Sequence, residues 1–198
     1  KAKVAAASDF VAGKVVPVAL DFAAGAAKGT FEGRAGTDPM VADGRIALDL
    51  GDLSAVSALA GIARPALPEG LGARQVQVAG MLSMLSDGAM RLDGADIRLD
   101  GNQLAGDLAF EPGGARPMIQ ATLTAGALDL SALTGGDGGS EGGSGGGKGW
   151  PKTPIDASGL GAVDAVVALR AQSLDLGVIT LAPFAVDAAV DRARARSE

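Results

Sequence analysis

The sequence contains no histidine, no cysteine and no tyrosine, and it contains tryptophan only once. Without histidine and cysteine, the chain lacks the commonest general base, the thiol nucleophile and the usual zinc ligands. A serine nucleophile would need a lysine or a carboxylate as its base, and no Ser-x-x-Lys motif occurs. We therefore expect a protein that is not an enzyme, with no catalytic residue, no cofactor and no metal ion.

Aromatic residues are scarce at 3%, and positive charge is outnumbered, which gives a net charge of −6. An acidic chain argues against nucleic-acid binding, which needs a basic face. Hydrophobic residues still make up 47% of the chain, so Ala, Leu, Val and Ile supply the apolar surface. No signal peptide is recognisable, and the longest uncharged apolar stretch, residues 53–63, is too short to span a bilayer. We expect an excised fragment whose anchor or targeting segment lies outside it.

Apolar residues alternate with polar ones along most of the chain. Lys28, Thr30 and Glu32 would share one face of a strand, while Phe31 and the neighbouring glycines would share the other. The same period recurs in many segments, which are separated by turn signals such as Asp43-Gly44. The pattern predicts a mainly β protein: an antiparallel meander of long strands that forms a curved sheet or groove, with one or two short amphipathic helices.

One segment departs from this period. Its apolar residues recur at helical spacing between Leu53 and Ala63, so we predict a helix near residues 53–64. Asp52 or Ser54 could cap the start, and Pro65 would end the helix. The expected organisation is a β-rich region over residues 1–134 that contains this helix, a flexible loop over 135–149, and a β-hairpin over 150–198 that completes or extends the same sheet.

The stretch DGAMRLDGADIRLDGNQLAGDLAFEPGG, residues 87–114, shows how the alternation is interrupted. The pair Met90 and Leu92 and the pair Ile97 and Leu99 lie five residues apart at their nearest members, which would place them on opposite faces of a regular strand. One extra residue at Gly94 would restore a shared face, so we predict a β-bulge there. The same five-residue step separates Leu169 from Leu174, which suggests that one supersecondary unit is used twice.

A glycine-rich tract, residues 135–149, divides these two units. Its composition is typical of a flexible linker. Gly142, Gly147 and Lys148 nearly match a phosphate-binding loop, but Gly149 stands where that motif needs Ser or Thr. Trp150 follows directly, and we expect its ring to pack the end of the loop against the sheet.

Several segments resemble the C-terminal region of AsmA-family proteins. They are PMIQATLTAGALDLSAL (Pro117–Leu133), then a loop of variable length, and WPKTPIDASGLGAVDAVVALRAQSLDLGVITLAPFAVDAAV (Trp150–Val190). The upstream segments GTFEGRAG and DGRIALDLGDLSAVSALAG are similar to the repeat that precedes this region in the family. Their order carries the resemblance: a strand ending in Leu-Asp-Leu, a loop, a Trp, a Pro-Ile-Asp step and a long strand pair. The family usually continues into more strands beyond the position of Glu198.

The resemblance implies a bacterial envelope protein that is anchored to the inner membrane by an N-terminal helix and places a long β-structure in the periplasm. AsmA-like proteins are similar to bridge-type lipid-transfer proteins, whose curved sheet forms an apolar groove, and they are implicated in moving phospholipid toward the outer membrane. The implied partners are a phospholipid or another acyl-chain lipid, the inner membrane, and other envelope proteins.

Two interpretations of the apolar face follow from the alternation. In the first, the face lines a lipid groove, and in the second it is the core of a closed β-sandwich that serves as a structural or protein-interaction domain without lipid. A smooth aliphatic wall with few aromatic residues favours the first. The candidate lipid contacts are then Val16, Val18, Leu20, Phe22, Phe31, Ile46, Leu48, Leu50, Val76, Val78, Met90, Leu92, Ile97, Leu99, Leu104, Leu108, Phe110, Ile119, Leu123, Val167, Leu169, Leu174, Leu176 and Leu181.

Overall fold

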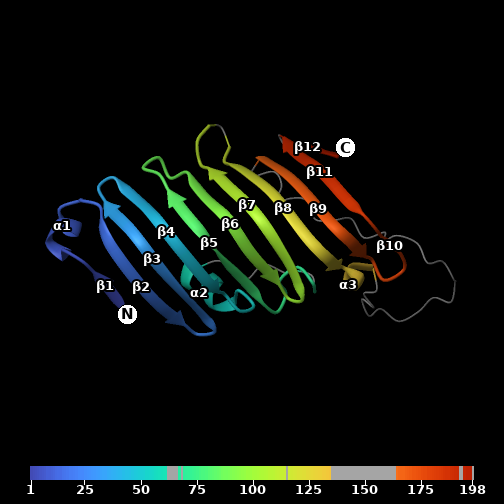
Figure 1. Cartoon of the computed structure of the whole chain (residues 1–198), viewed down its shortest axis with the longest axis horizontal. Helices are drawn as coiled ribbons and strands as arrows, with labels where there is room; N and C mark the ends of the chain where they lie inside the picture. Colours follow the sequence, from blue (N-terminus) through green and yellow to red (C-terminus); the bar gives the residue numbers. More distant parts are fainter. Residues whose placement is uncertain (62–66, 68, 115, 135–163, 192–193, 198) are drawn as a thin grey trace.

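The computed structural model describes residues 1–61, 67, 69–114, 116–134, 164–191 and 194–197, and within them the chain forms one open sheet (Figure 1). Twelve strands belong to this sheet, and eleven of them follow one path from β1 to β12. The prediction of a mainly β protein built from a curved meander is confirmed. The glycine tract, the phosphate-loop resemblance and Trp150 lie outside the described residues.

The long strands are eight to twelve residues each, and short elements sit at the ends and in the connections. The strands are β1 (Ala2–Val4), β2 (Val16–Ala24), β3 (Ala27–Thr37), β4 (Met40–Asp49), β5 (Val76–Met84), β6 (Met90–Leu99), β7 (Asn102–Glu111), β8 (Met118–Asp129), β9 (Asp164–Asp175), β10 (Thr180–Leu181), β11 (Phe184–Asp191) and β12 (Arg194–Ser197). The helices are α1 (Ala7–Val11), α2 (Ser54–Ala60) and α3 (Ser131–Thr134).

Neighbouring strands pair antiparallel with one exception. Strand β9 runs parallel to β8, with Leu123 opposite Leu169 and Ala125 opposite Ala171. A parallel pair needs a crossover of a dozen residues or more, whereas a hairpin needs only a few. The chain between β8 and β9 is long enough for such a crossover, and the alternation pattern alone did not predict the parallel pair.

The register aligns the apolar residues of all the long strands on one side of the sheet. We call this side the apolar face and define it by four rows of residues that are paired across neighbouring strands, except for Gly80 and Ala95, which meet where the pairing of β5 with β6 is irregular. The rows are Val16-Ala35-Ala42-Met84-Met90-Phe110-Ile119-Ala165, Val18-Gly33-Gly44-Leu82-Leu92-Leu108-Ala121-Val167-Ala188, Leu20-Phe31-Ile46-Gly80-Ala95-Gly106-Leu123-Leu169-Val186 and Phe22-Gly29-Leu48-Val78-Ile97-Leu104-Ala125-Ala171-Phe184. Every residue in these rows is apolar or glycine.

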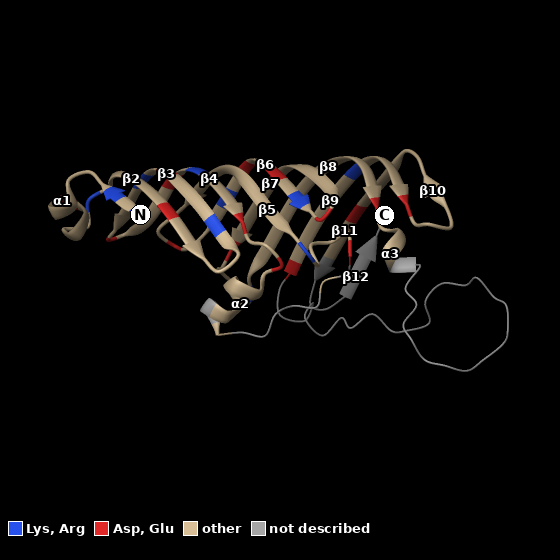
Figure 2. Ribbon diagram, turned by 90° about the horizontal axis from the view of Figure 1, so that it is seen from below, with Lys and Arg blue, Asp and Glu red and all other residues tan. Residues whose placement is uncertain are grey.

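The other side of the sheet, which we call the polar face, carries the charged residues. Lys28, Thr30, Glu32 and Arg34 project from β3 on this side, as the alternation predicts, and each is exposed. The sheet curves like an arch, and α2 lies on the side toward which it curves (Figure 2). Gly72, which follows α2 in the chain, lies against the side chains of Val76 and Leu99, so the apolar face is the concave one.

The predicted bulge lies where the sequence places it. The pairing of β6 with β7 shifts between Leu92 and Ala95, and Gly94 adopts a φ of +57°. A left-handed residue at this point is the signature of a bulge that begins with glycine. The backbone N–H of Gly94 donates to the Asp107 carboxylate on β7 at 2.9 Å, which fixes the irregularity to the neighbouring strand. The bulge returns Ile97 to the face that Leu92 occupies.

Helix α2 begins near the expected position, but its N-cap residue is Leu53, no side chain caps it, and the helix is shorter than the spacing predicts. The Asp52 carboxylate accepts the Ser54 backbone N–H at 3.1 Å and the Ser54 hydroxyl at 2.6 Å. At the other end, Gly61 adopts a φ of +67° and terminates the helix directly after Ala60. Glycine, rather than Pro65, is therefore the stop signal.

Close approach of strands on the concave face explains why glycines pair across β3 and β4. Gly33 lies opposite Gly44, and a Cβ atom on Gly33 would clash with the Asp43 carbonyl oxygen and lie 2.5 Å from the Gly44 Cα atom. The backbones could not keep this approach if either residue carried a side chain.

We predict that Gly33→Ala destabilises the protein by roughly 1–3 kcal/mol, the usual cost of overpacking a site that cannot relax. The matched control is Gly126→Ala on β8, where a Cβ atom would have no neighbour within 4 Å. This control should leave the free energy of unfolding within about 0.5 kcal/mol of the wild-type value. Urea unfolding of the two variants measures both effects, and equal losses would contradict the close-approach explanation.

Candidate functional site

All of the candidate lipid contacts lie on the apolar face or along one of its borders, which is formed by the ends of β4, β6, β8 and β9. We call this border the covered border. Leu50 and Leu176 directly follow β4 and β9, and Leu181 lies in β10 opposite Leu174. The remaining candidates lie within the long strands. The structure therefore brings residues from distant parts of the sequence onto one continuous surface.

The side chains of this surface differ in how far they are exposed to solvent. Near the border, Leu104, Leu128 and Leu174 are 5–8% exposed and form a buried cluster with Ala171. At the N-terminal end of the sheet, Leu20 and Phe22 are 38% and 39% exposed. The apolar face is thus most closely covered at the corner that holds this cluster and accessible at Leu20 and Phe22, while single positions such as Val16 and Ile46 are also buried.

A polar cluster fastens the covered border. The side chain of Asp100, in the turn between β6 and β7, accepts five backbone N–H groups from the segment 70–75 at 2.8–3.2 Å. The donors are Gly70, Gly72, Ala73, Arg74 and Gln75. Asp100 itself adopts a φ of +54°, a conformation that aspartate tolerates better than most residues. One carboxylate thereby satisfies nearly every donor of an irregular segment.

Asn102 completes this cluster and is itself only 4% exposed. Its amide nitrogen donates to the carbonyl oxygens of Gly70 and Asp129, each at 2.8 Å, and its amide oxygen accepts the Asp129 N–H at 2.7 Å. These bonds tie the segment 70–75 to β7 and to the end of β8. A buried amide with its partners in place costs little, whereas an unpaired one would be destabilising.

The hydrogen bonds change the acidity of Asp100. Partial burial by itself would raise the pKa of this carboxyl, but the N–H groups of Arg74, Gln75, Gly70 and Gly72 outweigh it and lower the pKa to about 2. Backbone donors stabilise the charged form, and several of them on one carboxylate act together.

Other aspartates terminate strands in a simpler way. The sequence Leu-Asp-Leu occurs at the ends of β4, β8 and β9, and each aspartate accepts the N–H two residues further on. The Ser131 hydroxyl and N–H hold the pKa of Asp129 below its ordinary value, and the Gln77 amide does the same for Asp49. The bonds to Gly51, Ser131 and Gly177 are turn contacts, whereas the Gln77 amide reaches Asp49 from the neighbouring strand β5.

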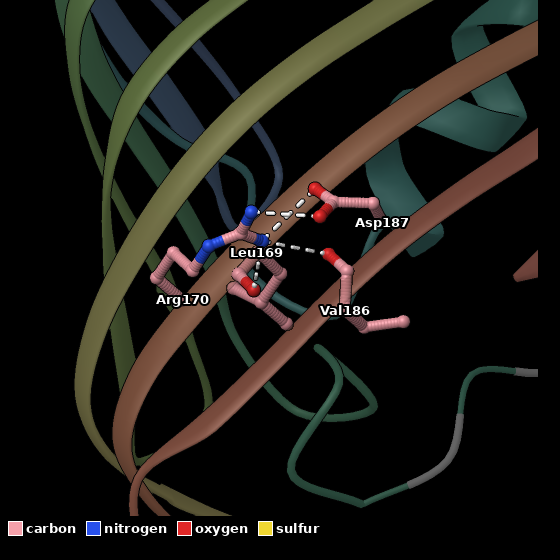
Figure 3. Close-up of polar contacts among 4 residues, drawn as sticks. All are labelled: Leu169, Arg170, Val186 and Asp187. Atoms are coloured by element: carbon pink, nitrogen blue, oxygen red, sulfur yellow. Dashed lines mark hydrogen bonds and ion pairs between the residues drawn. The ribbon is translucent and has the colours of Figure 1, made fainter. Parts of the chain in front are cut away.

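The polar face is stabilised by pairs across strands. Arg170 on β9 donates to both carboxylate oxygens of Asp187 on β11, at 2.9 and 2.7 Å, and to the carbonyl oxygens of Leu169 and Val186 (Figure 3). The hydrogen bond and charge of Arg170 lower the pKa of Asp187, and Asp187 raises that of Arg170. Both side chains are about half exposed, so solvent screening leaves this pair little net contribution to stability.

The polar face also has a shallow hollow of about 570 Å³. Its floor is made by the small side chains of Thr30, Ala47 and Ala79, and its border includes the ion pair of Lys28 with Asp49 at 3.7 Å. The hollow arises because three short side chains lie side by side among longer charged ones. It is open to solvent, and the charges that border it are of both signs.

The residue spacing did not single out Asp100 or Asn102. Each makes contacts with residues 25–32 positions away, and no periodicity signals such contacts. Among the described helices, none is both long and apolar enough to cross a bilayer. Comparisons with family models, with curated proteins and with solved structures gave no significant match to this chain.

The lowered pKa of Asp100 predicts an acid-sensitive contribution to stability. The unfolded carboxyl titrates near 3.8 and the folded one near 2, so the contribution is complete above about pH 5 and disappears as the pH falls through 2. Between pH 5 and pH 2.5, we expect Asp100 to account for about 1–1.5 kcal/mol of the loss in unfolding free energy.

Urea unfolding at the two pH values, compared between the wild type and Asp100→Asn, measures this contribution. Asp87→Asn is the control, because Asp87 is an exposed turn residue that accepts a single N–H, from Ala89. The loss should be smaller in Asp100→Asn and unchanged in Asp87→Asn. An unchanged loss in both variants would show that the carboxylate of Asp100 does not stabilise the folded state.

Proposed function

We propose that the chain is a periplasmic part of an AsmA-like envelope protein, whose apolar face takes up the acyl chains of phospholipids during their transfer toward the outer membrane. The observation that carries this proposal is the apolar face itself: four paired rows that cross the sheet without one polar side chain. The proposed role is non-enzymatic, and the inner-membrane anchor belongs to the full-length protein.

The dimensions of the face suit an acyl chain. Nine strands spaced at about 4.8 Å extend roughly 38 Å, and four rows spaced at about 6.7 Å extend roughly 20 Å along the strands. Half of a bilayer's hydrocarbon core is about 15 Å thick, so one acyl chain fits along a strand.

The side chains suit a ligand that must move. Each methylene group removed from water gains about 0.8 kcal/mol, so a chain gains affinity from many weak contacts. The rows contain no charge and no hydrogen-bonding side chain that would fix a ligand in one position. The order of segments that resembles the AsmA family, with Leu-Asp-Leu at the end of β8, supports the same proposal.

A closed β-sandwich without lipid is the competing interpretation. The described strands form an open sheet with β1 at one end and β12 at the other, and no second sheet is present among the described residues. This openness favours a surface that a ligand can reach. The two interpretations differ in what a charge on the apolar face should do, and the difference can be measured.

We predict that a photo-reactive residue at Leu123 crosslinks to phospholipid, while one at Thr122 does not. The two residues are neighbours on β8, Leu123 on the apolar face and Thr122 exposed on the polar face, so they differ mainly in the face they occupy. Crosslinking is read by mass spectrometry after incubation with phosphatidylethanolamine vesicles. Equal crosslinking at the two positions, or none at either, would contradict a lipid-binding apolar face.

A second variant separates lipid binding from a closed core. Leu108 lies half-buried in the middle of the apolar face, opposite Leu92 and Ala121. We expect Leu108→Asp to stay folded by circular dichroism and to lose co-purified lipid by native mass spectrometry. Unfolding of Leu108→Asp, with no lipid on the wild-type protein, would instead favour the closed sandwich.

A further inference from the structure

The segment 69–75 lies on the apolar face at its covered border. A Cβ atom on Gly72 would lie 2.7 Å from the Val76 side chain and 3.5 Å from that of Leu99. A Cβ atom on Gly70 would lie 3.7 Å from the Leu130 side chain, beyond the end of β8. The segment therefore reaches from β5 and β6 past β7 to the end of β8, over apolar side chains.

Hydrogen bonds attach the segment 69–75 to the sheet. The five N–H groups that it presents to Asp100, and the carbonyl oxygen that it presents to Asn102, join an irregular backbone to two side chains of one turn. A single carboxylate thus determines whether this stretch of backbone keeps its hydrogen-bond partners. Charge-assisted bonds of this kind are stronger than neutral ones.

The opposite border of the sheet looks different. There Met90, at the far end of β6, is 38% exposed, although Val16 in the same outer row is 5% exposed. Beside the segment, in contrast, Val76 is 9% exposed. The two ends of β5 and β6 therefore differ: the segment that Asp100 holds lies against Val76 and Leu99 at one end, and Met90 is accessible at the other.

We propose that the segment 69–75 is a flap over the apolar face and that Asp100 is the latch that keeps it closed. With the latch made, Val76 and Leu99 are shielded. With the latch broken, the flap lifts and lengthens the accessible face toward the ends of β5 and β6. That an acyl chain would occupy the lengthened face rests on the proposed function, but the movement of the flap does not.

The absence of cysteine in the wild-type chain allows a direct test. Leu99→Cys places a thiol under the flap, and Met90→Cys places one at the other end of the same strand. The rate of labelling by a small neutral maleimide is measured for each thiol, with and without Asp100→Ala. We expect Asp100→Ala to accelerate labelling of the Leu99→Cys thiol by at least about tenfold, the shift that the loss of even one of its five charge-assisted bonds would produce. Labelling of the Met90→Cys thiol should stay unchanged.

Two further variants keep the test decisive. Gly72→Ala presses on Val76 without altering the carboxylate, so it should also accelerate labelling at the Leu99 position even if Asp100→Ala fails to fold. Asp100→Asn keeps one acceptor oxygen and should give an intermediate rate. Equal acceleration at both thiols would indicate general destabilisation, and no acceleration at the Leu99 position in any variant would show that no latched flap exists; either result overturns the proposal.

Failure of this test is distinguishable from failure of the proposed function. The labelling rates require no lipid, so a flap could be present on a face that binds no phospholipid. Conversely, lipid crosslinking at Leu123 could occur beside a segment that never opens, because Leu123 lies on β8 opposite Gly106, in an inner row of the apolar face.

Discussion

The structure depends on a register that keeps one face of a wide sheet free of polar groups. Successive side chains point to opposite faces, so a slip of one residue in any strand would put its charged residues on the apolar face. On β3 such a slip would bring Lys28 and Glu32 onto the concave side. Each apolar side chain that the register keeps on this face gains about 1.5–3 kcal/mol when it is fully buried, and each misplaced charge costs more.

Local irregularities serve this same register. The bulge at Gly94 restores the shared face within β6, and the paired glycines of β3 and β4 permit close approach where the sheet bends. In β9, Ala171 and Leu174 are both buried although they are three residues apart, so the strand changes the side it presents in between. The structure tolerates such breaks because each returns the apolar residues to the concave face.

The sequence predicts much of this arrangement, because alternation is a local property. The faces of β3 and the position of the bulge follow from residue spacing alone. The parallel pairing of β8 and β9 does not, because their alternation would suit either direction. The role of Asp100 is also hidden: Asp-Gly signals a turn, and the five donors that make this aspartate distinctive come from a segment distant in sequence.

Polar and apolar side chains occupy different faces and borders of the sheet. Carboxylates end strands or pair with cations on the polar face, and the one strongly hydrogen-bonded carboxylate holds a segment of backbone. A face meant for a protein partner would be expected to concentrate aromatic or arginine anchors at its centre. Here the aromatic residues of the apolar face are phenylalanines on β2, β3, β7 and β11, and most are separated by several strands of Ala, Gly and branched aliphatic residues. Such a surface offers many equivalent weak contacts and no preferred anchor. Those properties suit an aliphatic ligand that slides better than a partner that must dock in one position.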